Sequence, residues 1–383
     1  MNSTEPERTR VRVRRKVRTR IPRRKRGTVR IAIGLAVLAV TIISVWAYLW
    51  RTGLIPDNQS VANWYETEHS STALVNLPAD DAPHANYMEW WYYNGHLWTG
   101  DDKKYSFHYV FFLVNALSSF TVAHASFIDH QTGKRYTVQR RSAGNPSSGR
   151  ENSFEFVLGN WSMAGGNGKD RLTLETPEFS FDLALTSTRP PVLQGGTGLL
   201  DFKTAGSSYY YSRPRMRISG TAAVGNDRHP VTGQAWFDHQ WGDFRTTLLG
   251  WDWFAIQLTD GADIMLYLLQ DSNGETVLRS GTYSRHGQTE VLNAADFETH
   301  ITDFWTSPTT GVSYPVNWTI KIPSKNIQLA LSPMIREGEF DGRVTSYLVY
   351  WEGPIKITGS HNGIGFLEST GYPGQASKKK NNQ

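Results

Sequence analysis

From about residue 84 to residue 375 the chain is a succession of short apolar runs separated by turn-forming residues, and this pattern constrains the fold most. The runs are rich in β-branched and aromatic residues, and Thr-Gly-Asp, Asp-Gly and Asn-Gly sequences separate them as hairpin turns do. No long amphipathic helix pattern interrupts them. The predicted strands are 105–114, 154–158, 179–185, 251–258, 264–269, 327–331, 347–351 and 355–358. The region therefore predicts an all-β fold, built as barrels or sandwiches rather than as a parallel α/β sheet.

An internal echo divides this region into two halves. When the chain is aligned with itself so that Trp90 meets Trp251, Tyr92 also meets Trp253, Tyr93 meets Phe254, Leu97 meets Leu258 and Gly100 meets Gly261. Each copy is an aromatic strand that runs into a glycine turn. The echo predicts two tandem, related β-barrels, which we place at residues 84–238 and 239–375.

The N-terminal part has a different composition. Residues 1–30 hold thirteen arginines and lysines against two glutamates, so the net charge of +5 comes from this arm. Residues 31–50 carry no charge, and at about 1.5 Å per helical residue they can span a hydrocarbon core of about 30 Å. Trp46, Tyr48 and Trp50 close this run as an aromatic belt. The pattern predicts a single transmembrane helix in the inner (cytoplasmic) membrane, with the barrels in the periplasm or outside the cell.

Two alternatives compete with this anchor. A cleaved signal peptide is one, but no small-x-small cleavage site follows the apolar run. A nucleic-acid clamp is the other, but no recognition helix follows the basic arm, and we expect no nucleic-acid partner. Residues 51–83 are predicted to be a polar linker, and residues 376–383 a disordered tail.

Several classes of site are excluded by what the sequence lacks. With no cysteine, the chain has no disulfide, thiolate zinc site or cysteine nucleophile. It has no G-x-S-x-G elbow, no H-E-x-x-H motif, no phosphate-binding loop and no dinucleotide fingerprint. His96, His108 and His124 alternate with apolar residues, but their spacing fits no metal motif. We therefore expect neither a cofactor nor a metal.

Three segments are more specific than composition. They are Met88-Glu89-Trp90-Trp91-Tyr92-Tyr93-Asn94-Gly95-His96-Leu97; Gly233-Gln234-Ala235-Trp236-Phe237-Asp238-His239-Gln240-Trp241-Gly242 with Leu249-Gly250-Trp251-Asp252-Trp253-Phe254; and Tyr350-Trp351-Glu352-Gly353 with Gly371-Tyr372-Pro373. In this order they resemble the AttH-like and carotenoid 1,2-hydratase (hydroxyneurosporene synthase) family. The resemblance implies tandem lipocalin-like barrels with a hydrophobic cavity for an isoprenoid or lipid-like ligand.

The hydratase branch of that family adds water to a carbon–carbon double bond without a cofactor. Such chemistry needs an acid that protonates an alkene, aromatic faces that hold the cation, and a base that holds water. His239 and Trp241 are candidates as proton donor and cation-binding ring, because an imidazole lies beside an indole face, and Asp238 is adjacent to them. Tyr267 is a candidate because it falls where the resemblance places the family's tyrosine. The alternative for His239 is a structural role, with a hydrogen bond to a carbonyl group or to Asp243. On a strand, Asp238 faces one way while His239 and Trp241 share the other face.

One position departs from the hydratase pattern. An acidic residue is expected two positions after Tyr267, on the same strand face, and this chain has Leu269. The acid could come instead from Asp238, Asp243, Asp252 or Glu89. The departure favours a general AttH-like protein over a carotenoid hydratase.

The candidate ligand-binding residues lie on two strands of aromatic residues. An alternative role for these side chains is to fill the core or the contact between the barrels. If the two tryptophans around Asp252 pack between the barrels, Asp252 points into a barrel; if they point into it, Asp252 lies outside. The candidates are Glu89, Trp90, Trp91, Tyr92, Trp251 and Trp253.

The leading hypothesis is a membrane-anchored, extracytoplasmic protein that binds an apolar small molecule and hydrates or isomerises a double bond, as a hydro-lyase. The alternative hypothesis is a non-catalytic lipid carrier of the cell envelope. Titratable groups that converge in the cavity would favour the enzyme, because a carrier needs a mostly apolar lining.

Overall fold

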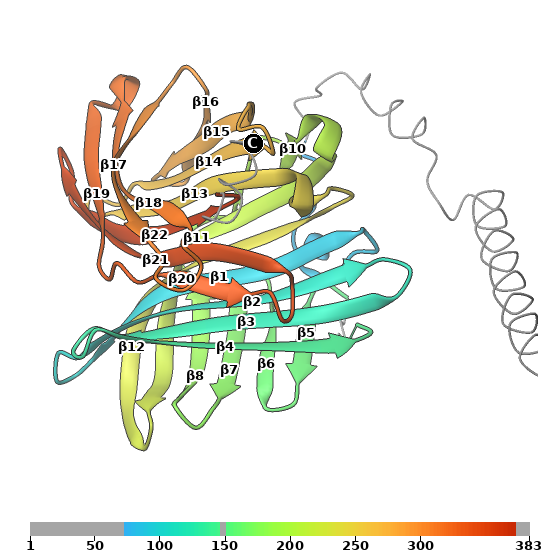
Figure 1. Ribbon diagram of the computed structural model, residues 1–383, viewed down its shortest axis with the longest axis vertical. Coiled ribbons are helices and arrows are strands. Elements are labelled where there is room, and N and C mark those ends of the chain that lie inside the picture. The colour runs from blue at the N-terminus through green and yellow to red at the C-terminus, as the bar shows by residue number, and fades with distance from the viewer. Residues whose placement is uncertain (1–72, 146–150, 373–383) are drawn as a thin grey trace, which may run out of the picture. The chain divides into compact units, whose positions relative to one another are not determined.

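The computed structural model describes residues 73–145 and 151–372, which form two antiparallel sheets (Figure 1). Short 3-10 helices at Ala79–Asp81, Lys203–Ala205, Thr246–Leu248 and Pro323–Lys325 are the helical elements of this part of the chain. The prediction of an all-β fold is therefore confirmed.

The predicted arm, anchor and tail, and residues 51–72 of the predicted linker, lie outside the described residues. Within the described ranges, no helix is both long enough and apolar enough to cross a membrane.

The first sheet follows the order β4-β3-β2-β1-β12-β11-β8-β7-β6-β5, with the short β9 and β10 paired to β11. It curls into a barrel-like shape, and no pairing joins its two end strands in the described residues. Its strands are β1 (Met88–Thr99), β2 (Lys104–Asn115), β3 (Ser119–Asp129), β4 (Lys134–Ala143), β5 (Phe154–Leu158), β6 (Trp161–Gly166), β7 (Lys169–Glu175), β8 (Phe179–Ser187), β9 (Val192–Leu193), β10 (Leu199–Asp201), β11 (Ser207–Val224) and β12 (Asp227–Gly242).

The second sheet follows the order β16-β15-β14-β13-β22-β21-β19-β18-β17, with β20 paired to β21. In both sheets the first strand lies between the second strand and the last one, which is the structural counterpart of the internal echo. Its strands are β13 (Leu249–Leu258), β14 (Asp263–Asp271), β15 (Thr276–Arg285), β16 (Gln288–Asn293), β17 (Glu298–Thr306), β18 (Ser313–Ile322), β19 (Ile327–Pro333), β20 (Glu339–Gly342), β21 (Leu348–Gly359) and β22 (Gly363–Thr370).

Three clusters of buried hydrophobic residues stabilise the two sheets and the contact between them. One fills the inside of the first sheet and includes Trp91 and Phe237, and a second fills the inside of the second sheet and includes Phe254 and Trp351. The third joins the two sheets and includes Tyr92, Trp253 and Tyr267. Because alternate side chains of a strand point to opposite faces, each central strand serves one sheet interior and the contact between the sheets.

Two predicted boundaries differ from the structure. The strands predicted at 347–351 and 355–358 form one strand, β21, which continues through Pro354. Pro354 needs no ladder hydrogen bond from its nitrogen on this side, because β20 pairs with β21 only up to Trp351 and β19 pairs with β21 only from Ile355 onward. The boundary predicted between residues 238 and 239 falls inside β12, which continues to Gly242.

Candidate active site between the two sheets

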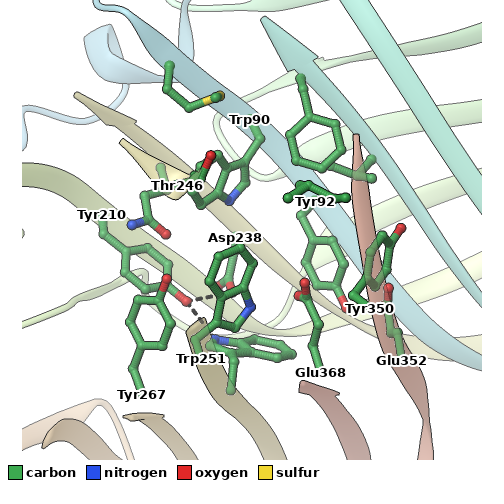
Figure 2. A pocket seen from close by; sticks show the side chains of 16 residues that line it. Trp90, Tyr92, Tyr210, Asp238, Thr246, Trp251, Tyr267, Tyr350, Glu352 and Glu368 are labelled. Atoms are coloured by element: carbon green, nitrogen blue, oxygen red, sulfur yellow. Dashed lines mark hydrogen bonds between the residues drawn. The ribbon is translucent and has the colours of Figure 1, made fainter. Parts of the chain in front are cut away.

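A pocket lies where the outer faces of the two sheets meet (Figure 2). Its cavity volume is about 60 Å³, or about 690 Å³ when the space of the open mouth is included, so the pocket is narrow. The first sheet contributes Trp90, Tyr92, Phe112 and Tyr210 to its aromatic walls, and the second contributes Trp251, Trp253, Tyr267 and Tyr350. Three carboxyl groups also line it, those of Asp238, Glu352 and Glu368.

The alternation of β12 divides the Asp-His-Gln-Trp motif between two environments. Asp238 and Gln240 face the pocket, while His239 and Trp241 point into the first sheet. The same alternation on β1 sends Trp90 and Tyr92 to the pocket and Trp91 into the core.

Asp238 is held by three donors. Tyr210 Oη donates to its Oδ2 at 2.6 Å, and Oδ1 accepts hydrogen bonds from Ser212 Oγ and from Trp236 Nε1, the latter at 2.7 Å. Burial raises the pKa of Asp238 to about 7, although these hydrogen bonds act to lower it. Asp238 is therefore a fixed carboxyl group that titrates near neutral pH.

Glu352 and Glu368 lie directly opposite each other on β21 and β22. Burial raises the pKa of Glu368 to about 7, against a hydrogen bond with the Trp251 side chain that lowers it. Burial and then the charge of Glu368 raise the pKa of Glu352 well above its ordinary value, against a hydrogen bond that Tyr92 Oη donates to Glu352 Oε1. Since facing carboxylates repel, the pair retains a proton at neutral pH.

The tyrosines of the pocket are neutral hydrogen-bond donors. Burial raises the pKa values of Tyr92, Tyr210 and Tyr267 well above that of free tyrosine. Tyr210 Oη also accepts a hydrogen bond from Trp253 Nε1 at 2.9 Å, and Tyr267 bonds with the Gln240 side chain. Acids, bases and neutral donors thus line one narrow pocket.

The acids of the pocket do not lie at the position of Leu269. Leu269 pairs with Trp251 and packs between the sheets, so no carboxyl group stands two positions after Tyr267. Instead, Tyr267, Trp253, Glu368 and Glu352 follow one another across the four strands β14, β13, β22 and β21. Glu368 and Glu352 therefore lie on the side of Trp253 that is opposite to Tyr267.

His239, Trp241, Glu89 and Trp91 lie together inside the first sheet, away from the pocket lining. Glu89 Oε1 lies 2.8 Å from His239 Nε2 and 2.7 Å from His84 Nδ1. The His84 ring stacks on Trp241 and the His239 ring on Trp91.

This His84, Glu89 and His239 group is the set among the described residues that could hold a metal ion. Its distances are those of hydrogen bonds from two imidazoles to one carboxylate oxygen. Burial also lowers the pKa of His239, against its hydrogen bond with Glu89.

Asp252 points into the second sheet because its neighbours Trp251 and Trp253 pack between the sheets. It accepts hydrogen bonds from Ser369 Oγ at 2.6 Å and Tyr372 Oη at 2.8 Å. Gly371 permits the second bond: its φ is +83°, and a Cβ there would lie 2.4 Å from the Cα of Gly250.

Asp252 predicts a pH dependence of stability. Burial raises the pKa of Asp252 to about 6, so between about pH 4 and 6 the folded chain holds a proton that the unfolded chain has lost. Its contribution to the free energy of unfolding therefore falls as pH rises through this window. Asp252→Asn should gain stability relative to the wild type over that range, by roughly 2–3 kcal/mol. Urea unfolding at several pH values checks this, and a difference between the two proteins that stays constant with pH would contradict it.

Glu352, Glu368 and Tyr210 are among the pocket residues that sequence reasoning missed. Glu352 lies within β21 and faces the pocket beside Tyr350. The alternation of Tyr350 and Glu352 around the core residue Trp351 was a signal that could have shown this. For Glu368 and Tyr210 the sequence carried no such signal, because their roles depend on which strands pair.

Comparison with known proteins gives three findings. A family model described as AttH-like matches residues 68–372. A crystal structure of an AttH from Nitrosomonas europaea has a TM-score of 0.71 and 27% identity, and the match covers 78% of this chain and 97% of that one. Kievitone hydratase from Nectria haematococca shares the fold, with a TM-score of 0.65, 20% identity and coverage of 80% and 97%.

A curated relative is also similar over part of its length. The dehydratase asqC of Emericella nidulans is 26% identical over 199 residues, which cover 49% of this chain and 54% of the relative. The chain thus spans about half the length of that protein in the alignment.

Proposed function

The chain belongs to the AttH-like family, and we propose that it is a cofactor-independent hydro-lyase that removes water from, or adds water to, an apolar unsaturated small molecule. The observation that carries this proposal is the convergence of Asp238, Glu352 and Glu368 in one aromatic pocket. The similarity to a dehydratase supports the same reaction class.

The pKa values suggest a role for each carboxyl group. Near neutral pH Asp238 ionises, while the pair of Glu352 and Glu368 still holds a proton. In dehydration the glutamate pair protonates the leaving hydroxyl group, the C–O bond breaks and water leaves. Asp238 takes a proton from the adjacent carbon, and the electrons of that C–H bond form the double bond. Hydration is the reverse sequence.

The walls of the pocket suit a substrate with a flat, unsaturated part. Trp90, Trp251, Trp253 and Tyr267 present rings that can stabilise positive charge on carbon as the C–O bond breaks. A narrow aromatic slot favours an isoprenoid or aryl-substituted alcohol over a bulky polar substrate. The lining is mostly apolar, as both the carrier and the enzyme hypotheses allow, and the three carboxyl groups among the aromatic rings favour the enzyme.

Oxygen exchange tests this function without knowledge of the natural substrate. The full-length protein is incubated in ¹⁸O-water with a panel of tertiary allylic alcohols and β-hydroxy ketones that carry isoprenoid or aryl groups. A hydro-lyase should place ¹⁸O in at least one recovered alcohol, or release its alkene, as read by mass spectrometry. Glu368→Gln should lose this activity.

Asp252→Asn is the matched control, since it removes a buried carboxyl group that lies outside the pocket. No exchange with any compound, together with a bound lipid that is released unchanged, would support the carrier.

We also propose that residues 31–50 tether the protein to the inner membrane with the sheets outside the cytoplasm. The basic arm before the apolar run supports this orientation. A phosphatase reporter fused after Lys380 should be active only when exported, and activity of a cytoplasmic reporter at the same point would reverse the topology.

A further inference from the structure

A row of buried polar side chains leads from Glu352 away from the pocket. Glu352 Oε2 lies 3.3 Å from His108 Nδ1, and His108 Nε2 lies 3.4 Å from Tyr350 Oη. Tyr350 Oη lies 3.0 Å from His124 Nδ1. These side chains come from β2, β3 and β21, so the row runs within the contact between the sheets.

The row continues to the surface. His124 Nε2 lies 2.8 Å from Thr345 Oγ1, which lies 2.6 Å from the Oε1 of the partly exposed Gln139. Thr345 belongs to the turn between β20 and β21, where Val344 is 83% exposed. One end of the row is therefore at the pocket acid and the other is close to solvent.

The donors along the row can all point in one direction. Tyr92 donates to Glu352 Oε1, so the proton of a neutral Glu352 belongs on Oε2, a buried atom that makes no hydrogen bond in the described structure and lies 3.3 Å from His108 Nδ1. That proton faces His108 Nδ1. Each imidazole then carries its own proton on Nε2, and the hydroxyl groups of Tyr350 and Thr345 donate outward.

The surroundings keep both imidazoles neutral, as such a row requires. Burial, and then the charge of Arg135, lower the pKa of His108, and burial lowers the pKa of His124 to about 3. Ser126 Oγ lies 2.6 Å from the same His108 Nδ1, so the Ser126 hydroxyl must turn away before that nitrogen can accept the proton of Glu352. Phe340 stacks on the His124 ring at 4.5 Å between ring centroids. Each ring thus offers one N–H and one lone pair.

We propose that His108, Tyr350, His124 and Thr345 form a proton path between Glu352 and solvent. When every proton shifts by one link, the O–H bond of Glu352 breaks and an N–H bond forms on His108 Nδ1. His108 Nε2 then passes its proton to Tyr350, Tyr350 to His124 Nδ1, and His124 Nε2 to Thr345. The hydroxyl proton of Thr345, which points to Gln139 Oε1, is released to solvent water as that hydroxyl rotates. The reverse shift returns one proton to Glu352.

Such a path would supply the proton that the proposed function uses. The proposal of the path rests on the proposed function only in this respect. A substrate that fills the narrow pocket excludes water from the inner side of Glu352. The path reaches Glu352 from behind, so the acid can exchange its proton while the pocket is occupied. Its four relay residues would then be positioning residues, since none needs to touch the reacting carbon atoms.

Infrared spectroscopy of the full-length protein tests the path without any substrate. The C=O stretch of protonated Glu352 is identified as the carboxyl band that Glu352→Gln removes at neutral pH. After dilution into D₂O, the shift of this band gives the rate of proton exchange. His124→Phe keeps a ring against Phe340 but breaks the path, and it should slow the exchange roughly tenfold or more.

His96→Phe is the matched control. His96 is a buried histidine on the same face of the first sheet, burial lowers its pKa to about 3, and it lies outside the path. The His96→Phe variant should exchange the proton of Glu352 at the wild-type rate. Thr345→Val provides a second break at the surface end, should His124→Phe fail to fold. Exchange at the wild-type rate in a folded path variant, or no band that depends on Glu352, would overturn the proposal. Neither result bears on turnover, so the two proposals fail separately.

Discussion

Replacing Asp238 by asparagine is expected to lower kcat/KM of the proposed hydro-lyase reaction by about 10²–10⁴-fold, the usual contribution of a general base. Asparagine keeps the shape of the side chain but cannot take a proton from carbon. Since Tyr210, Ser212 and Trp236 all donate to Asp238, the variant changes the charge of a group whose position is already fixed.

The pH profile separates this role from a structural one. Because the pKa of Asp238 is about 7, the wild-type kcat/KM should rise with pH through neutrality as the base ionises. It should fall at higher pH, when the glutamate pair loses its proton. Asp238→Asn should lose the rising limb and Asp252→Asn should keep both limbs. A rising limb that persists in Asp238→Asn would exclude this residue as the base.

Asp81→Asn is expected to destabilise the fold by about 3–5 kcal/mol, because it removes the hydrogen-bonded ion-pair partner of a buried arginine. Both carboxylate oxygens of Asp81 accept from Arg213 Nη2, at 2.8 and 2.9 Å. Asp81 also accepts hydrogen bonds from Tyr211 Oη and from the backbone N–H of Asn167. The Asp81 side chain is 0% exposed and that of Arg213 is 4% exposed, so water cannot replace the lost partner.

Guanidinium unfolding of the full-length protein, followed by tryptophan fluorescence, measures this loss. Asp80→Asn is the matched control, since the neighbouring carboxyl group is partly exposed and has no partner of fixed charge in the described structure. It should change the free energy of unfolding by less than about 1 kcal/mol. Equal losses in the two variants would show that the charge of Asp81 has no special role.

His239 lies inside the first sheet and does not line the pocket. Its Nε2 is bound to Glu89 and its ring lies between Trp91 and Trp241, so it supports the strand that presents Asp238 and Gln240. The candidate site keeps Asp238 and Tyr267 from the predicted catalytic set, and Trp90, Tyr92, Trp251 and Trp253 from the predicted ligand-binding set.

The sequence by itself determined the class of fold and which residues share a strand face. Turn residues and alternating aromatic runs predict short antiparallel strands, and the period of two places Asp238 and His239 on opposite faces of their strand. The echo of Trp90 and Trp251 predicts two related halves, because it depends on local patterns alone.

Only the tertiary structure decided which face of each strand lines the pocket. An aromatic strand of this kind is buried on both faces, so its hydrophobic pattern does not distinguish a sheet interior from a contact between sheets. Glu368 reaches Trp253 because β22 pairs with β13, and both meet Asp238 because two sheets pack together. Glu368 is more than a hundred positions from both Trp253 and Asp238, and its contacts depend on strand pairing and sheet packing that no local pattern encodes.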